Sequence, residues 1–391
     1  MLGADPFLAS LHRHRLAAGL IVLQAALSTL LLVLALATTS EIRSRLVQPS
    51  GLDEARLLRV VIRGQTNAQA QSLEQARLAQ LPGVSAVMRI NQVPFGGESW
   101  KASFGSRPGS AAGTVKGTVY LGDVDLRARL ALPLRQGRDF RPGEYGYGFS
   151  DFHHVLLSES IATRLFPQGH AVGNRIFMGK RPLRVVGIYA ALQGATPEDT
   201  DSLIVPVRFG AGKAHTYLLR LGSSQRPAAD VVATAVQDAT AARWLADLRS
   251  VAELRQAYFA RDRWIAFGLL AGAGVWLLGT GVGLANLADL LLQARLRQIG
   301  LCRALGARSG QIRWQLRREH LLLTGTGALA GLALLHALLR AWPWLGMQLH
   351  TGSAGLQLFA IALVVATGQC AMWPITREAD AVSPTGALRH A

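Results

Sequence analysis

The stretch of this sequence best suited to bind another molecule is short and basic, and lies between positions 295 and 318. Its arginines are opposed by one acid, Glu319. Apolar residues recur among them at a spacing that can form one face of a helix: Ile299, Leu301 or Cys302, Leu305 and Ile312. Such a helix can dock into a groove of a soluble partner or lie on anionic lipid. The residues alone leave both alternatives open.

Patterns of common catalytic and metal sites are missing from the sequence. Gly179-Lys180 and Gly212-Lys213 lack the upstream glycine and the following Ser or Thr of a phosphate-binding loop. No H-E-x-x-H, C-x-x-C or G-x-S-x-G occurs, and strand neighbours such as His153 and His154 point to opposite faces. We therefore expect no catalytic residue, no metal, no cofactor bound by this chain and no enzymatic activity of its own.

The basic segment lies between the second and third of four uncharged apolar stretches. These are Leu16 to Ala37, Trp264 to Asn286, Leu321 to Leu339, and Leu356 to Met372. A helix needs about 20 apolar residues to cross a bilayer. The first stretch is N-terminal and could be a signal peptide, but it exceeds the roughly 7 to 15 residues of a signal core, which favours an uncleaved anchor. The predicted fold class is a membrane protein with four transmembrane helices, one plus three, and a large α+β extracytoplasmic domain between helices one and two.

The arginines predict orientation, because basic loops stay in the cytoplasm. We expect a multi-pass protein of the bacterial cytoplasmic (inner) membrane with both termini cytoplasmic. The predicted divisions are an N-terminus 1–15, helix one 16–38, a periplasmic domain with stalk 39–262, helix two 263–292, a cytoplasmic loop 293–319, helix three 320–340, a periplasmic loop 341–355, helix four 356–374 and a tail 375–391.

The composition of the chain restricts its possible partners less strongly than the motifs do. The formal charge of +17 and the pI near 11.2 could suggest nucleic acid, but membrane topology accounts for the arginine-rich loop, so we expect no nucleic-acid partner. The two cysteines, Cys302 and Cys370, both fall outside the predicted periplasmic domain. That domain must be held by its hydrophobic core, which over 200 residues can supply.

Within residues 39–262, two strand-helix-strand units are predicted to frame an inserted lobe. The first has strand 57–63, helix 67–81 and strand 84–90, and the second has strand 215–221, helix 228–245 and strand 247–251. The lobe, about 115–207, should contain a helix over 159–166 and a strand over 183–189. No glycine or proline interrupts 251–264, so a continuous helix should run into the membrane, either as a stiff lever or as a passive connector.

Two long segments resemble one known family. The run from Val155 reads Val-Leu-Leu-Ser-Glu-Ser-Ile-Ala-Thr-Arg-Leu-Phe-Pro167 and is similar to the periplasmic core domain of MacB-type permeases. The loop after Asn286 reads Arg295-Leu-Arg-Gln-Ile-Gly-Leu-Cys-Arg-Ala-Leu-Gly-Ala307 and resembles the FtsX-like permease motif R-x-x-E-I-G-x-x-R-A-L-G-A. Gln298 stands where the family commonly has Glu, so an ion pair made by that Glu is lost.

The resemblance implies a permease subunit of a MacB-like (type VII) ABC transporter that couples ATP hydrolysis by a separate ATPase to efflux of a drug, peptide or similar substrate. ATP-Mg would bind the ATPase. Implied partners are that ATPase, a second permease in a homo- or heterodimer, a membrane fusion protein, an outer-membrane channel and the lipid bilayer. Alternatives are mechanotransmission, either to activate cell-wall hydrolases or to extract lipoproteins, and a transmembrane sensor.

The resemblance also favours the docking alternative for the basic segment. The implied ATPase-coupling loop consists of Arg295, Arg297, Gln298, Ile299, Gly300, Arg303, Ala304, Leu305, Gly306, Ala307 and Ile312. Gly279, Gly283, Gly327 and Gly331 are predicted to let helices pack closely, since glycine allows backbones to approach. Asp289, near the end of helix two, is expected to reach the interface and pair with Arg295 or Arg297.

Overall fold

A computed structural model gives the structure of the protein and divides it into two compact units. Residues 1–44 and 262–391 form the membrane unit, and residues 45–261 form the sheet-rich domain. The residues that the structure describes are 15–65, 67–109, 113–123, 125–148, 151–190, 192, 200–210, 214–222, 226–239, 242–293, 308–341 and 352–381.

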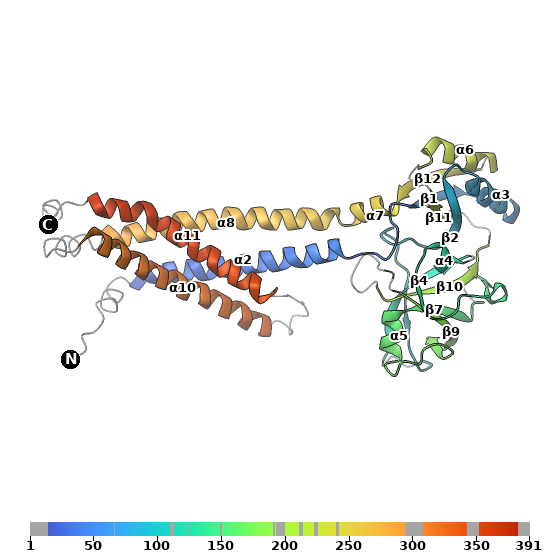
Figure 1. Ribbon diagram of the computed structural model, residues 1–391, viewed down its shortest axis with the longest axis horizontal. Helices are drawn as coiled ribbons and strands as arrows, with labels where there is room; N and C mark the ends of the chain where they lie inside the picture. The colour runs from blue at the N-terminus through green and yellow to red at the C-terminus, as the bar shows by residue number, and fades with distance from the viewer. Residues whose placement is uncertain are drawn as a thin grey trace. The chain divides into compact units, whose positions relative to one another are not determined.

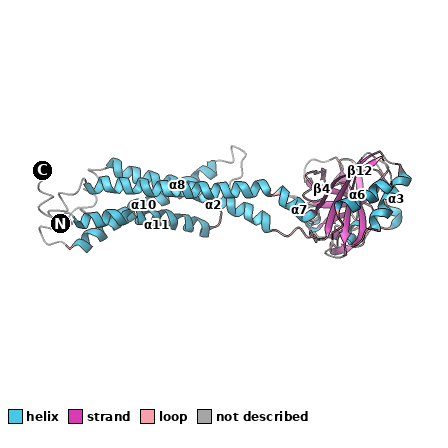
Figure 2. Ribbon diagram, turned by 90° about the horizontal axis from the view of Figure 1, so that it is seen from above, coloured by secondary structure: helices cyan, strands magenta, loops and turns pink. Residues whose placement is uncertain are grey.

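Four long helices make up the described membrane unit: α2 (Arg15–Val47), α8 (Ala260–Gln293), α10 (Ser309–Ala341) and α11 (Ala354–Ala381). Each contains a window apolar enough to cross a membrane. Figure 2 shows helices alone in this unit and the strands gathered in the other. The predicted fold class is therefore confirmed, with a sheet-rich domain between the first and second membrane helices.

Half of the sheet-rich domain has the ferredoxin-like arrangement. Its elements are β1 (Leu57–Gly64), α3 (Ala68–Ala79), β2 (Val84–Ile90), β11 (Ala214–Leu221), α6 (Ala229–Ala239) and β12 (Arg243–Ser250). The strands lie in the order β12-β1-β11-β2 with antiparallel neighbours, as two split strand-helix-strand units require. α3 and α6 lie side by side against this half (Figure 1).

The prediction of a helix over 228–245 was wrong at its C-terminal end. α6 ends at Ala239, β12 begins at Arg243, and Val251 begins the next helix, α7 (Val251–Tyr258). Residues 243–250 pair with β1, and the buried side chain of Arg243 forms an ion pair with Glu74 of α3. Tertiary pairing therefore overrides the local helix propensity of Leu245 and Ala246.

The inserted lobe extends the same sheet, in the order β2-β4-β10-β7-β9-β5. Its elements are β3 (Lys101–Phe104), β4 (Val115–Gly122), α4 (Leu126–Arg129), β5 (Leu134–Gly137), the 3-10 helix η1 (Pro142–Glu144), β6 (Gly146–Tyr147), β7 (His154–Ser158), α5 (Glu159–Leu165), β8 (Arg175–Met178), β9 (Arg181–Tyr189) and β10 (Ser202–Arg208). The helix and strand predicted in this lobe are confirmed as α5 and β9.

Alternation along β1 explains how the sheet builds its cores. Leu58, Val60 and Ile62 point to one face and pack with residues of α3 and α6. Leu57 belongs to a second cluster, which includes Leu254 of α7. A third cluster, around α5, fills the inserted lobe. Burial on both faces holds this domain without any cysteine in its sequence.

Candidate functional site

Most of the predicted coupling loop lies outside the described residues. This applies to ten of its members: Arg295, Arg297, Gln298, Ile299, Gly300, Arg303, Ala304, Leu305, Gly306 and Ala307. Ile312 is described, and it is buried on α10 rather than exposed in a stripe. The structure therefore shows what flanks the loop, which is where α8 ends and α10 begins.

Both flanks of the loop enter one buried cluster. Ala288 and Leu292 of α8, Ile312 of α10, and Met372 and Ile375 of α11 pack together. The start of α10 is held by a hydrogen bond from the backbone N–H of Arg308 to the side-chain oxygen of Gln311, at 3.1 Å. Three membrane helices therefore share a core next to the loop.

Two pairs of arginine and tryptophan side chains lie at this end of the bundle. The guanidinium of Arg317 lies 5.2 Å from the ring centre of Trp373, and that of Arg318 lies 5.4 Å from Trp314. Both tryptophans are more than half exposed. Cations over exposed indoles are typical of a membrane-water interface, where the ring is half solvated and the charge reaches water.

Sequence analysis missed His320, one turn further along α10. Its side chain is buried, and neither ring nitrogen has a hydrogen-bond partner among the described residues. It borders a cavity of about 30 Å³ together with Glu319, Ala18 and Met372, which is enough space for a water molecule. The sequence feature that could have identified His320 is an ionisable residue at the edge of an apolar run. Burying an ionisable side chain inside a membrane costs free energy, so such a residue often has a function.

The predicted packing glycines differ in what surrounds them. A Cβ added at Gly331 would overlap with the carbonyl oxygen of Ala26, and one at Gly327 would lie 2.8 Å from the Cβ of Ala25. A Cβ at Gly283 would overlap with the side chain of Gln24. Gly327 and Gly331 therefore allow α10 to pack closely against α2, and Gly283 allows α8 to do the same. Gly279 has open space around it within the described chain.

Neutral polar groups link α2 to α8 in the middle of the bundle. The hydroxyls of Ser28 and Thr280 lie 2.8 Å apart, and the indole N–H of Trp276 donates to Ser28 at 3.1 Å. Near the end of α8, Asp289 accepts a hydrogen bond from the amide of Gln293 at 2.8 Å. The arginines predicted to pair with Asp289 lie outside the described residues, so that pairing stays a prediction.

The predicted continuous helix from 251 into the membrane is interrupted at one residue, Phe259, which separates α7 from α8. Its buried ring lies 6.0 Å from that of Phe95. Arg255 of α7 donates to Glu54 at 2.6 Å and to the carbonyl oxygen of Leu46 at 3.0 Å. These contacts fix α7 within the sheet-rich domain.

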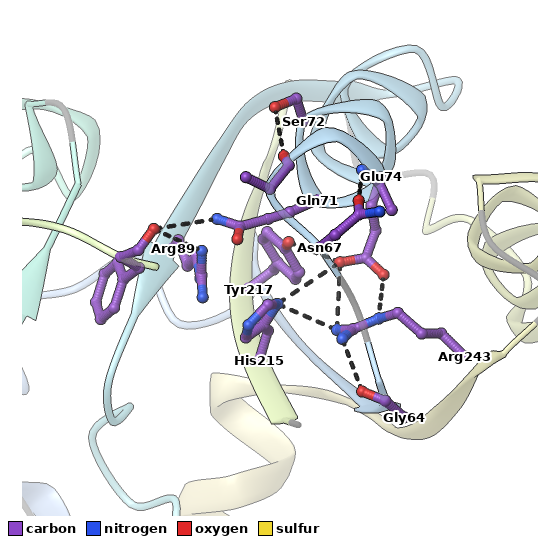
Figure 3. A network of polar contacts seen from close by, with 12 residues as sticks. Gly64, Asn67, Gln71, Ser72, Glu74, Arg89, His215, Tyr217 and Arg243 are labelled. Carbon is purple, nitrogen blue, oxygen red and sulfur yellow. Dashed lines mark hydrogen bonds and ion pairs between the residues drawn. The ribbon is translucent and has the colours of Figure 1, made fainter. Parts of the chain in front are cut away.

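A buried polar network lies under α3 in the sheet-rich domain (Figure 3). Arg243 donates through Nε to Glu74 at 2.8 Å and through NH1 to the carbonyl oxygen of Gly64 at 3.0 Å. The hydroxyl of Tyr217 donates to Glu74 at 2.7 Å, and NH2 of Arg243 lies 3.1 Å from Nδ1 of His215. All four side chains are almost completely buried.

The protonation states in this network follow from its geometry. Burial raises the pKa of Glu74, but His215, Tyr217 and Arg243 outweigh it, and the net pKa is lowered. Burial lowers the pKa of His215, and although Glu74 acts to raise it, the charges of Arg89 and Arg243 oppose that effect and the net pKa is lowered. A neutral His215 accepts at Nδ1 from Arg243, which leaves Nε2–H without a partner. The network is therefore one Glu–Arg ion pair with two neutral supports.

Comparison with known protein families gives two adjoining matches. Residues 17–251 match the MacB-like periplasmic core domain, and residues 270–374 match the FtsX-like permease C-terminal domain. Together the matches run from the first membrane helix to α11, and the first alone covers more than half of the chain.

Curated relatives agree with these matches. The chain is 29% identical to the macrolide export ATP-binding/permease protein MacB 1/2 of Paracoccus denitrificans, over 66% of this chain and 38% of that protein. It is 25% identical to the uncharacterized ABC transporter permease YknZ of Bacillus subtilis, over 83% and 81%. It is 26% identical to the pyoverdine export ATP-binding/permease protein PvdT of Pseudomonas syringae, over 81% and 47%. The chain thus spans less than half the length of the MacB and PvdT relatives.

Two solved structures are similar in part. The periplasmic region of MacB from Actinobacillus actinomycetemcomitans aligns with a TM-score of 0.35 and 13% identity, over 55% of this chain and 97% of that one. The extracellular domain of the YknZ transporter from Gram-positive bacteria aligns with a TM-score of 0.32 and 12% identity, over 49% and 100%.

Proposed function

The chain belongs to the MacB/FtsX-type family of ABC transporter permeases, and from this premise we propose that it converts ATP hydrolysis by a separate ATPase subunit into motion that drives efflux. ABC permeases of this family are components of transporters and are not enzymes themselves. ATP and Mg²⁺ would bind the ATPase. Two of the relatives are named for export, of macrolides and of pyoverdine, which supports efflux as the activity.

The protein is a multi-pass inner-membrane protein, and the proposal places both termini and the loop 293–319 in the cytoplasm. Lys and Arg in short loops are retained on that side. The pairs Arg317–Trp373 and Arg318–Trp314 support an interface at the same end of the bundle. This orientation puts the sheet-rich domain in the periplasm.

The observation that carries the mechanism is the buried cluster beside the loop. Ala288 and Leu292 precede the loop, Ile312 follows it, and all three pack with α11. An ATPase that pushes on residues 295–307 would therefore move α8, α10 and α11 together. α8 is joined through Phe259 to α7, and this connection offers a route for the motion to the sheet-rich domain.

The proposed assembly contains two permease subunits, because four crossings from one chain make only half of a two-fold transporter. The second subunit is another copy or a homologous permease. A membrane fusion protein and an outer-membrane channel would carry the exported molecule onward from the periplasm.

Co-purification tests the coupling loop. The full chain would be co-expressed with each ABC ATPase of the source bacterium and purified by a tag on the permease. Leu305→Asp should abolish recovery of the ATPase, because a charge would replace the apolar centre of the docking helix. Leu73→Asp, the same change on the exposed face of α3 in the sheet-rich domain, is the matched control and should leave recovery unchanged. Equal recovery of the ATPase with Leu305→Asp would remove the loop assignment.

Deletion of the gene separates efflux from mechanotransmission. Efflux predicts increased sensitivity to a drug or peptide that restored expression reverses. Chained cells with unaltered sensitivity would instead favour activation of wall hydrolases. Accumulation of lipoproteins in the inner membrane would favour lipoprotein extraction.

A further inference from the structure

Two arginines near the start of α10 carry positive charge that no described side chain balances. The guanidinium of Arg317 lies over the ring of Trp373, and that of Arg318 lies over the ring of Trp314. Among the side chains that the structure describes, no carboxylate forms an ion pair with either guanidinium. Glu319, the next residue, borders the small cavity inside the bundle. The surface at this point therefore has two cations in need of an anion.

Arg317 lies at the contact between α10 and α11, which run against each other (Figure 1). Its Nε is buried and has no hydrogen-bond partner among the described residues, and its backbone carbonyl oxygen accepts the side-chain amide of Gln369 at 3.4 Å. The Arg317 side chain is half-buried, whereas that of Arg318 is exposed. A cation over a ring face still keeps its N–H groups for an acceptor. Both guanidinium groups can therefore donate to an anion at this surface.

Exposed leucines continue the same two faces of α10 one turn further from the loop. Residues four apart share a helix face, so Leu321 follows Arg317 and Leu322 follows Arg318. Leu321 is 44% exposed and Leu322 is 45% exposed. Both lie in α10, which is long and apolar enough to cross a membrane. Each face thus changes from a cation to an apolar surface within about 6 Å along the helix axis, which matches the head and chains of a phospholipid.

We propose that an anionic phospholipid binds here, with its phosphate at Arg317 and Arg318 and its acyl chains along Leu321 and Leu322. Arginine donates parallel N–H groups to phosphate oxygens, and basic sites beside membrane helices favour anionic headgroups. Arg313, one turn before Arg317 on the same face, adds to the positive potential. The leucines select a lipid over a soluble phosphate. The inference requires only that this end of the bundle meets the membrane surface, so it can hold or fail independently of the ATPase and of efflux.

Native mass spectrometry tests the preference for an anionic headgroup. The full chain, released from a non-ionic detergent, would be titrated with phosphatidylglycerol and with phosphatidylcholine that carry identical acyl chains. Phosphatidylglycerol should bind at least about tenfold more tightly. Both lipids contain the phosphate, but the ammonium of choline is repelled by the arginines. Equal affinity for the two lipids would overturn the proposal.

The soluble headgroup distinguishes a lipid site from a phosphate site. Glycerophosphoglycerol, which is phosphatidylglycerol without its acyl chains, would be added to the lipid-bound protein, and inorganic phosphate would be added in a parallel sample. Neither should displace the lipid at concentrations up to about 10 mM, because neither can cover Leu321 and Leu322. Displacement by either one would identify a soluble anion as the ligand and would overturn the proposal.

Variants locate the lipid on α10. Arg317→Gln removes the guanidinium and should weaken the binding of phosphatidylglycerol about tenfold, with little change for phosphatidylcholine. Arg340→Gln removes the same charge near the other end of α10 and should change neither affinity. The basic loop before α10 is intact in both variants, so a loss confined to Arg317→Gln separates this site from a general attraction of lipid to arginine. An equal loss in both variants would contradict the assignment.

A folding check keeps this test decisive. The SDS concentration at the midpoint of unfolding shows whether each variant is folded. Should Arg317→Gln fail to fold, Arg318→Gln replaces it, with a smaller expected loss of about threefold because that side chain is exposed. Unchanged affinity for phosphatidylglycerol in folded Arg317→Gln, or in Arg318→Gln where it replaces that variant, would rule the site out.

Discussion

The two units of this protein treat buried polar groups in opposite ways. In the sheet-rich domain, Glu74 and Arg243 form a buried ion pair that His215 and Tyr217 support. In the membrane unit, the described buried contacts between helices are neutral, as between Ser28 and Thr280. A charge without a partner is costly in either place, but a domain with a sheet can surround it with donors, whereas a helix bundle in lipid has few donors to spare.

The difference shows what specifies each structure. The ion pair joins α3 to β12, two elements distant in sequence, and therefore selects the register of the sheet edge. In the bundle, selection depends on shape, because α10 can meet α2 only where Gly327 and Gly331 remove the side chain. Three substitutions test this contrast.

The largest effect is expected from breaking the ion pair on one side. Glu74→Leu leaves the fully buried guanidinium of Arg243 without its anion and should destabilise the sheet-rich domain by about 3 to 5 kcal/mol. The double variant Glu74→Leu/Arg243→Met should recover most of this loss, since an apolar pair of similar volume replaces the charges. Hydrogen exchange of β1 and β11 peptides in the full chain measures both, with membrane-unit peptides as an internal reference.

The control for that variant is an exposed pair in the same domain. Arg135 and Glu159 lie 3.6 Å apart with both side chains more than half exposed. Glu159→Leu should change stability by less than about 1 kcal/mol. A comparable loss from Glu159→Leu, or a double variant no more stable than Glu74→Leu alone, would show that the buried pair does not carry the stability assigned to it.

A glycine pair in α10 gives the next largest effect, and substitution of only one of its two members should destabilise the bundle. Gly331→Ala places a methyl group on the carbonyl oxygen of Ala26 and should destabilise the bundle by about 1 to 3 kcal/mol. Gly325→Ala meets no atom within 4 Å and should be neutral or stabilise α10 by up to about 1 kcal/mol. Unfolding in bicelles by SDS, followed by tryptophan fluorescence, measures the two. Loss of equal size at both positions would argue against close packing at Gly331.

Sequence reasoning recovered the features that depend on local pattern. The four membrane helices follow from apolar length, and β1 and β2 follow from β-branched residues next to a turn at Pro82 and Gly83. It failed at Arg243, whose side chain turns inward toward Glu74, a residue that lies 169 positions away in the chain. A long-range ion pair leaves no local signal, so the predicted helix was carried through the residues of β12.

The same limit applies to the sites. The glycine motif indicated that α10 packs closely, but which helix it meets depends on how the bundle folds. His320 was not singled out, because its burial among four helices cannot be read from one of them. The lipid site proposed at Arg317 includes Trp373 of α11, and no spacing in the sequence relates the two residues.

The smallest effect is expected from the hydroxyl pair of Ser28 and Thr280. Thr280→Val keeps the shape of the side chain and removes the contact of 2.8 Å, and it should cost only about 0.6 kcal/mol, the typical value for such a bond between membrane helices. Ser28 still accepts the indole N–H of Trp276 and donates to Gln24, so that its own polar group keeps partners. SDS unfolding of Thr280→Val beside Thr326→Val, whose hydroxyl bonds only within α10, isolates the cross-helix term. A loss as large as that of Glu74→Leu would mean that the bundle relies on polar contacts as heavily as the sheet does, and the contrast between the units would fail.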